Sequence, residues 1–133
     1  MDDRFREEPY AWSAHIGMNM LDWSDGYAKF ELPLADFIMN RHGNPHGGAH
    51  ASLLDTVMGY AGCWTGDPDH QQMCLTLSLN VQYLSRPRGQ TFIAEGRKTG
   101  GGRSTFFAEG EIRDETGEII AKGTGTFRYR KST

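Results

Sequence analysis

Hydrophobic and polar residues alternate along much of the chain, and a period of two predicts β-strands. The clearest case is residues 74–83, where one face is apolar and the other carries small or polar side chains. The apolar positions are Leu75, Leu77, Leu79, Val81 and Tyr83. This alternation predicts one long strand with two chemically different faces.

Five other segments are predicted to be strands, from the same pattern and from the turn residues that separate them. They are residues 15–23, 27–34, 91–99, 104–113 and 118–129. In the second of these, Ala28, Phe30 and Leu32 would share one face. We expect the residues before Pro9 to be loosely ordered, and residues 10–14 to form a short helix or an extended arm.

Residues 49–64 have a different period, because apolar side chains recur there every three or four positions. One such series is Ala49, Leu53, Val57 and Ala61. This period predicts a helix that is buried over most of its circumference. A narrow polar stripe remains, made of Ser52, Asp55, Thr56 and Gly59. One helix among consecutive strands predicts an α+β fold, with the helix laid on an antiparallel sheet.

The length of 133 residues suits one domain, 1–133, with its core over roughly residues 15–130. The net charge of -3 disfavours nucleic-acid binding, and we interpret the basic residues 128–131 as a solvated tail. Cys63 and Cys74, without a signal peptide, favour reduced thiols and a cytoplasmic location. No apolar segment approaches the length of a membrane span, so no membrane partner is expected.

Residues 40–48 read as a loop, because Asn, Gly and Pro cluster there just before the predicted helix. Gly47 and Gly48 leave N–H groups open at the positive end of the helix dipole, which favours an anion or a polarised oxygen. Asp55 lies two turns further along. Its stripe could simply face water, but its small neighbours favour a cleft in which a carboxylate can act as base or nucleophile.

Gly47 and Asp55 are eight residues apart, which is ~12 Å along a helix. One carbonyl group cannot reach both residues of the same chain. If both act on one substrate, the acid must come from a second copy. Two antiparallel helices about a two-fold axis would bring each Asp55 near the Gly47 of the other chain. The spacing therefore predicts a homodimer with two equivalent sites at its interface.

Other chemistries have weaker support in the sequence. His42, His46 and His50 suggest a metal site, but the acid of H-E-x-x-H is missing and no metal is expected. We expect His42 and His50 to be surface histidines, and His46 to orient the loop by hydrogen bonding. Neither cysteine has a signature of activation. Residues 100–104 lack the spacing of a phosphate loop and are interpreted as a hairpin link.

The motif His46-Gly47-Gly48 is followed by an acid nine residues after the histidine, within an order of two strands, one helix and four strands. This combination, over residues 15–129, resembles hotdog-fold acyl-CoA thioesterases of the phenylacetate-pathway (PaaI-like) type. The resemblance implies a curved antiparallel sheet of about six strands wrapped around one long central helix. It also implies an acyl-CoA substrate, no cofactor, and homodimers that commonly pair again into tetramers.

The resemblance also implies a role for each matching residue. The Gly47 N–H would polarise the thioester carbonyl, and Asn40 would help to hold it. Asp55 would be the nucleophile or the base that activates water. Thr76, on the polar face of the long predicted strand, would orient that water, and His46 would support the site.

Further positions would contact the substrate. Gly48 lies at the helix start, and Arg103 and Ser104 lie where relatives hold the pantetheine arm and nucleotide of CoA. Positive charge for a phosphorylated ligand could come from Arg86, Arg88, Arg97, Lys98 and Arg103. The sequence leaves the acyl group open between small aryl and medium- or long-chain groups.

The leading interpretation is an acyl-CoA thioesterase, and two alternatives remain. A hotdog hydratase or dehydratase acting on acyl thioesters would rely on a histidine paired with an acid. A non-catalytic acyl-CoA-binding protein would normally carry an added DNA-binding segment. Asp55 separates catalysis from binding, because Asp55→Asn should abolish turnover and leave the fold and the dimer intact.

Overall fold

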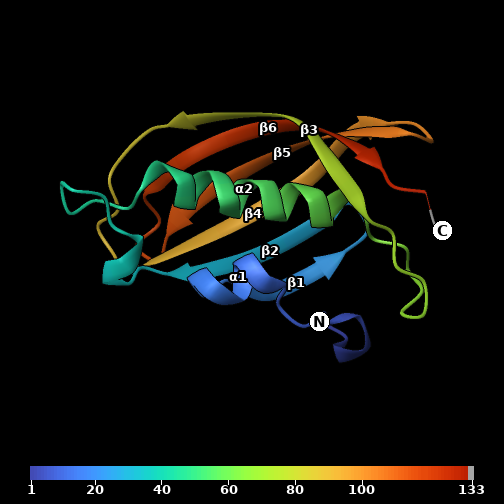
Figure 1. Ribbon diagram of the computed structural model, residues 1–133, viewed down its shortest axis with the longest axis horizontal. Helices are drawn as coiled ribbons and strands as arrows, with labels where there is room; N and C mark the ends of the chain where they lie inside the picture. The colour runs from blue at the N-terminus through green and yellow to red at the C-terminus, as the bar shows by residue number, and fades with distance from the viewer. Residues whose placement is uncertain (132–133) are drawn as a thin grey trace.

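The computed structural model describes residues 1–131. Six strands form one curved sheet that wraps around the long helix α2 (Gly47–Gly62) (Figure 1). This arrangement confirms the predicted α+β hotdog architecture. Ser132 and Thr133, which the predicted domain 1–133 includes, lie outside the described residues. None of the helices in the described range combines the length and hydrophobicity that a membrane span requires.

The sheet has the strand order β1-β2-β4-β5-β6-β3, and every neighbouring pair is antiparallel. The strands are β1 (Asn19–Ser24), β2 (Tyr27–Pro33), β3 (Cys74–Tyr83), β4 (Thr91–Gly101), β5 (Thr105–Asp114) and β6 (Ile119–Tyr129). In β2, Ala28, Phe30 and Leu32 are buried on one face, as their alternation predicted. The strands β1 and β3 form the two edges of the sheet.

The strand predicted for residues 15–23 is wrong in its first part. The helix α1 (Ala11–Ile16) occupies the beginning of this range, and β1 starts only at Asn19. Gly17 ends the helix in a left-handed conformation with φ of 91°, and its N–H donates to the carbonyl oxygen of Ser13. A glycine that looked like one position of an alternating strand is therefore a helix stop.

The residues before α1 pack against the rest of the molecule, contrary to the expectation of loose order. The 3-10 helix η1 (Asp3–Phe5) places the ring of Phe5 4.1 Å from that of Trp64. The guanidinium of Arg6 donates to the carbonyl oxygen of Met20 at 2.7 Å. These contacts tie the N-terminal segment to β1 and to the chain just after α2.

The helix α2 begins two residues before its predicted start and follows the 3-10 helix η2 (Asp36–Ile38) and a loop. Its buried side chains include Leu53, Leu54, Val57 and Met58, and the sheet contributes Phe92, Phe106 and Phe127 to the same core. Gly96 in β4 allows the sheet to approach the helix. A Cβ atom there would lie 2.4 Å from the carbonyl oxygen of Val57. The core thus depends on close helix–sheet packing.

The apolar alternation in β3 does not mark a single face. A β-bulge between Thr76 and Ser78 shifts the pairing with β6 by one residue. Thr76 points towards α2 before the bulge, whereas Leu79 packs against the core after it. Leu75 consequently lies on the outer face and is 52% exposed. The bulge is what directs the polar Thr76, rather than the leucine beside it, towards the helix.

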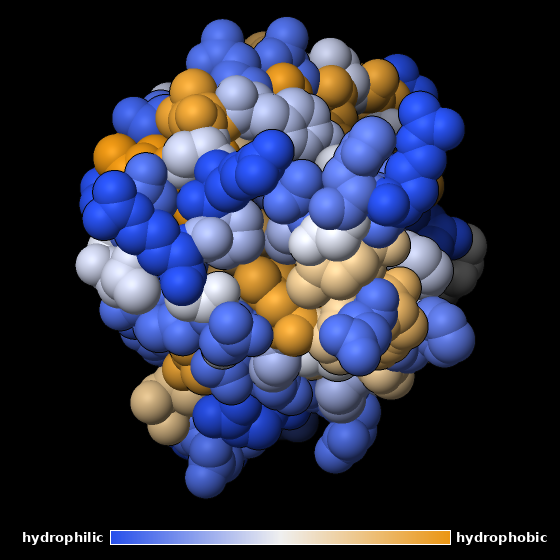
Figure 2. All heavy atoms as spheres, turned by 90° about the vertical axis from the view of Figure 1, so that its left-hand side faces the viewer, coloured by the Kyte–Doolittle hydropathy of each residue, from blue (hydrophilic) through white to orange (hydrophobic). Residues whose placement is uncertain are grey.

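The loop before α2 and the end of β3 lie at the same end of the molecule (Figure 1). Seen from this end, the surface is mostly hydrophilic, with apolar side chains gathered near its middle (Figure 2). Phe37 in η2 and Leu84 just after β3 are both well exposed. Exposed apolar side chains of this kind are often covered by a partner.

Candidate active site

The polar stripe of α2 has two halves with different neighbours. Trp12 Nε1 donates to Ser52 Oγ at 2.9 Å. The hydroxyl groups of Tyr10 and Thr56 lie 2.5 Å apart and share a hydrogen bond. The N-terminal segment and α1 therefore lie along this side of α2 (Figure 1). This half of the stripe is covered by the chain itself rather than by water.

Asp55 and Gly59, together with Thr56, line a cavity of about 310 Å³. The cavity lies between α2, the start of β3 and the N-terminal segment. Its walls include the aromatic rings of Trp23, Tyr60 and Phe127. A carboxylate that faces a partly apolar cavity can act on a bound molecule, which a carboxylate on an open helix face cannot do as effectively.

Asp55 is held by a side chain from another element. Thr76 Oγ1 in β3 donates a 2.7 Å hydrogen bond to Asp55 Oδ1. Among the described residues, no hydrogen-bond donor contacts Oδ2, so this oxygen can accept a proton from water. The structure therefore brings together two of the predicted site residues, which are 21 positions apart in the sequence.

The start of α2 offers one open backbone donor. Within residues 1–131, the N–H of Gly47 donates to no acceptor. The N–H of Gly48 is taken by Nδ1 of His46 at 2.8 Å. Because Nδ1 accepts this hydrogen bond, a neutral His46 carries its proton on Nε2. His46 is therefore the N-cap of α2, and Gly47 is left as the open donor.

Tyr83 is a residue of this region that the sequence did not single out. Its hydroxyl, at the end of β3, donates to the carbonyl oxygen of Gly47 at 2.7 Å. This bond fixes the first turn of α2 against the sheet. The alternation in β3 identified Tyr83 only as part of an apolar face, because periodicity carries no information about where a hydroxyl reaches.

Asn40 shapes the loop that leads into α2. Its Oδ1 accepts hydrogen bonds from the N–H groups of His42 at 2.9 Å and Asn44 at 3.2 Å. The N–H of Asn40 also donates to the carbonyl oxygen of Asn44 at 2.7 Å. Since the loop uses the side-chain oxygen, the Nδ2 amino group is the part of Asn40 that can donate to a substrate oxygen.

The predicted catalytic residues thus form two groups in one protomer. Asn40, His46 and Gly47 surround the start of α2, and Asp55 and Thr76 lie beside its middle. The two groups are ~12 Å apart along the helix axis. The first group has an open donor without an acid, and the second has an acid without an open donor.

The three histidines near the start of α2 have different surroundings. His50 is buried, which corrects the expectation that it lies on the surface. Its ring packs against the rings of Tyr83 and Phe92, and burial lowers the pKa of His50. His42 is exposed. Residues 1–131 contain no group of three His, Cys, Asp or Glu side chains placed to share a metal ion.

The hairpin between β4 and β5 and the end of β6 enclose a shallow depression of about 560 Å³. Its lining includes Arg103, Ser104, Arg128, Arg130 and Lys131. None of these four basic side chains forms an ion pair within the described part of the chain. The basic residues 128–131, expected to be a solvated tail, therefore form part of a cationic surface beside Arg103.

Arg86 does not join this surface. It follows the end of β3, whereas Arg103 lies beside the start of β3. A strand of 10 residues is roughly 30 Å long, so the two arginines of one protomer cannot hold the same phosphate group. Arg88 is also engaged elsewhere, 3.6 Å from the carboxylate of Glu118.

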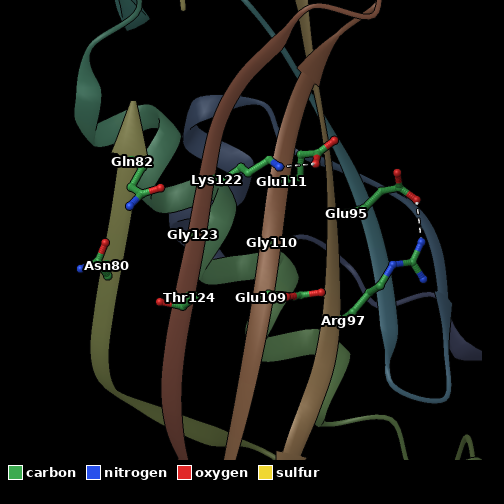
Figure 3. A pocket seen from close by; sticks show the side chains of 10 residues that line it. All are labelled: Asn80, Gln82, Glu95, Arg97, Glu109, Gly110, Glu111, Lys122, Gly123 and Thr124. Carbon is green, nitrogen blue, oxygen red and sulfur yellow. Dashed lines mark ion pairs between the residues drawn. The ribbon is translucent and has the colours of Figure 1, made fainter. Parts of the chain in front are cut away.

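Arg97 belongs to a separate polar depression of about 420 Å³ on the outer face of the sheet (Figure 3). Its guanidinium lies 3.6 Å from the carboxylate of Glu95. Lys122 lies 3.8 Å from Glu111 in the same depression. These charges face away from α2 and neutralise one another, so Arg97 cannot reach a ligand in the cavity beside the helix.

The curved sheet, the buried helix and the open start of that helix define a hotdog-fold protein. A sequence profile of the thioesterase superfamily matches residues 42–121. The chain belongs to this superfamily. The matched range contains the start of α2 as well as Asp55 and Thr76, so both groups of predicted site residues lie within it, apart from Asn40.

Solved structures share this fold over most of their length. A conserved protein from Pseudomonas aeruginosa is 29% identical with a TM-score of 0.83, and the match covers 97% of this chain and 98% of that one. A Bacillus halodurans protein solved with CoA is 26% identical with a TM-score of 0.79, over 98% and 85% of the two chains. The PaaI protein from the phenylacetic acid degradation operon of E. coli is 20% identical with a TM-score of 0.80, over 92% and 86%, and shows the fold alone.

Proposed function

We propose that this chain is an acyl-CoA thioesterase in which Asp55 is the general base or the nucleophile. Membership of the thioesterase superfamily supports hydrolysis of a thioester. The observation that carries the proposal is the carboxylate of Asp55, oriented by Thr76 and facing the cavity beside α2. No metal or organic cofactor is needed for this chemistry.

Hydrolysis needs a nucleophile at the thioester carbon and a stabilising group for the charge that develops on its oxygen. Oδ2 of Asp55 would take a proton from water while the water oxygen bonds to that carbon, or would attack the carbon itself. On either route the carbon–sulfur bond breaks. The sulfur leaves with its electron pair and takes up a proton to become the CoA thiol. On the first route the acyl group ends directly as a carboxylic acid. On the second route water then cleaves the mixed anhydride between Asp55 and the acyl group, which releases the acid and restores the carboxylate. Thr76 would keep the carboxylate aligned throughout.

The donor to the carbonyl oxygen would be the Gly47 N–H of a second copy. This N–H points from the positive end of a helix of 16 residues and has no acceptor within residues 1–131. One such donor contributes on the order of 3 kcal/mol to transition-state stabilisation. The distance of ~12 Å to Asp55 of the same chain is the reason for assigning it to a partner. Gly48 is less suitable, because His46 already uses its N–H.

A second copy would pair along β3. This strand is an edge of the sheet, so one side of its backbone is unpaired within the protomer. Exposed large apolar side chains gather along it and its flanks: Met73, Leu75, Leu77, Tyr83 and Leu84. Pairing two sheets along this edge would cover them and form a homodimer. Further pairing of dimers into a tetramer is part of the same proposal.

The CoA phosphates would bind the cationic surface at the end of the sheet. Arg103, Arg128 and Arg130 offer guanidinium groups that can pair with phosphate oxygens. Gln72 lines both this depression and the cavity beside Asp55, so the two hollows adjoin. The Bacillus halodurans structure with CoA supports this ligand.

The acyl group would be a small aryl or a medium-length chain. A cavity of about 310 Å³ with several aromatic walls fits a group of that size, and a PaaI-like aryl substrate falls within this range. A hydratase or dehydratase is less well supported, because no histidine lines the cavity among the described residues.

The proposal is tested by following thiol release from benzoyl-, phenylacetyl-, hexanoyl-, octanoyl- and palmitoyl-CoA. We expect turnover of at least one aryl- or medium-chain member and no hydration of crotonyl-CoA. Binding of these compounds without thiol release would identify a binding protein and reject the proposal. Hydration of crotonyl-CoA would favour the hydratase instead.

A further inference from the structure

The cavity beside Asp55 has a polar far end built by the N-terminal segment. Glu7 lines this end and is half-buried. Its Oε1 accepts a hydrogen bond from Gln71 Nε2 at 3.0 Å and a longer one from the Tyr60 hydroxyl at 3.5 Å. No donor contacts Oε2 among the described residues. The second carboxylate oxygen is thus available to a ligand.

The rise along α2 gives the shortest separation between this end and Asp55. Asp55 and Tyr60 are five positions apart, which is ~7.5 Å along the helix axis. An extended chain covers that length in about six bonds. Gly59 lies between them, and its missing side chain leaves the path open. A Cβ atom at Gly59 would lie 3.5 Å from Cys74 Sγ, which is an ordinary van der Waals contact, so Gly59 and Cys74 lie side by side in the wall of the cavity.

The charge of the cavity restricts what can reach Glu7. Asp55, Glu7 and Glu8 all line it, and no lysine or arginine does so within the described residues. An acyl group that ends in a carboxylate would meet like charges without a compensating cation. A hydroxyl group would instead donate to Glu7. Burial raises the pKa of Glu7, and a donor there would replace the water that its carboxylate has lost.

We propose that Glu7 determines specificity in this site: it selects acyl groups that carry a hydroxyl about six bonds from the thioester carbon and excludes those that carry a carboxylate there. The selection rests on the thioesterase function proposed above. In this proposal the N-terminal segment contacts the far end of the acyl group. This segment lies outside residues 42–121, which match the family profile.

A matched series of three six-carbon ligands tests this: hexanoyl-, 6-hydroxyhexanoyl- and adipoyl-CoA. Analogues in which a methylene replaces the thioester sulfur cannot be hydrolysed, so calorimetry gives Kd values without turnover. We expect the hydroxyl analogue to bind about tenfold tighter than the hexanoyl analogue, as one hydrogen bond to a carboxylate allows. The adipoyl analogue should bind about tenfold more weakly than the hexanoyl one.

Two variants assign these differences to Glu7. Glu7→Met has a side chain of similar length and should make the Kd values of the hydroxyl and hexanoyl analogues equal. Glu7→Gln removes the negative charge and should bring the Kd of the adipoyl analogue close to that of the hexanoyl analogue. Asp3→Asn, in the same exposed segment but outside the cavity, is the control and should change neither ratio. Equal binding of the hydroxyl and hexanoyl analogues to the wild type would overturn the proposal, as would unchanged ratios in both Glu7 variants.

Failure of the thioesterase function gives a different result. Thiol release from hexanoyl- and 6-hydroxyhexanoyl-CoA reports that function, whereas the Kd ratios of the inert analogues report selection by Glu7. Loss of thiol release with the ratios retained would reject hydrolysis and still support the role of Glu7 in binding. Thiol release without any dependence of the ratios on Glu7 would support hydrolysis and reject selection.

Discussion

The start and the middle of α2 carry different halves of the proposed hydrolytic site. The start has an open N–H at Gly47 and no acid beside it. The middle has the carboxylate of Asp55, but the N–H groups around it are used by the helix itself. Each region lacks what the other supplies, and ~12 Å of helix separates them. In the proposed mechanism, a motif that is continuous in the sequence therefore contributes to two sites, each shared with a second chain.

The two regions are nevertheless held by the same strand. Tyr83 at the end of β3 bonds the carbonyl oxygen of Gly47, and Thr76 near its start bonds Asp55. The strand β3 is also the edge along which a second copy would pair. Pairing there would fix the relative positions of both groups at once. The proposed roles of the Asp55 carboxylate and the Gly47 N–H can be tested separately, with a variant of each residue.

Removing the acid has the largest expected effect. Asp55→Asn should lower kcat by about 10³-fold, because the amide can neither accept a proton from water nor attack the thioester. Thiol release with the best acyl-CoA substrate measures this loss. Asp67→Asn, in the exposed loop after α2, is the matched control and should keep full activity. Retention of wild-type turnover in Asp55→Asn would remove Asp55 from the mechanism.

Removing the backbone donor should have the next largest effect. Gly47→Pro deletes the N–H at the first position of α2, where proline is tolerated, and His46 already has the extended conformation that precedes proline. We expect kcat to fall about 10²-fold.

Gly47→Ala is the control for this variant. Its Cβ would meet the same Tyr83 hydroxyl, at 3.2 Å, but it keeps the N–H. The alanine variant should therefore lose much less activity than the proline variant. Equal losses in both would mean that crowding against Tyr83, rather than the missing donor, causes the effect.

Combining the two variants tests whether the halves come from different chains. Co-expressed Asp55→Asn and Gly47→Pro chains form mixed dimers in which one of the two sites keeps both its acid and its donor. Half of the dimers in an equal random mixture are mixed, so activity should recover to about a quarter of the wild-type value. Dimers separated by two affinity tags give the direct measurement. A mixture no more active than its parents would place the acid and the donor in one chain.

The sequence predicted the fold because local patterns determine most of it. Alternation identified five of the six strands nearly to their ends, and the period of three to four residues identified α2. The polar stripe on α2 and the Gly47–Gly48 pair also led to the two groups of site residues. Gly17 was misread because one glycine fits both an alternating strand and a helix end.

The remaining features depend on residues that are distant in the sequence. The bulge in β3 is set by its pairing with Phe127 and Thr126 of β6, which alternation within β3 cannot show. The cationic surface forms because Thr105 of β5 pairs with Arg128 of β6. The N-terminal segment joins the cavity through its contacts with α2 and with the loop before β3. The cytoplasmic location stays a prediction from the two thiols.

A smaller effect is expected from the bond that orients the acid. Thr76→Val keeps the shape of the side chain but removes the donor to Asp55 Oδ1, and kcat should fall about tenfold. Thr124→Val, exposed on the outer face of β6, is the control and should have no effect on kcat (Figure 3). A loss in Thr76→Val as large as that in Asp55→Asn would show that the hydroxyl does more than orient the carboxylate.

The smallest effect concerns His46, whose Nδ1 caps α2 by accepting the N–H of Gly48. His46→Ala should lower the free energy of unfolding by about 1 kcal/mol, since an N-cap acceptor is lost. His46→Asn supplies another capping oxygen and should restore most of that stability. Urea denaturation measures both variants. If the role of His46 is to hold the helix start, His46→Asn should also keep most of the thiol-release activity. A stable His46→Asn protein with activity reduced as far as in Gly47→Pro would instead show that the imidazole contacts the substrate.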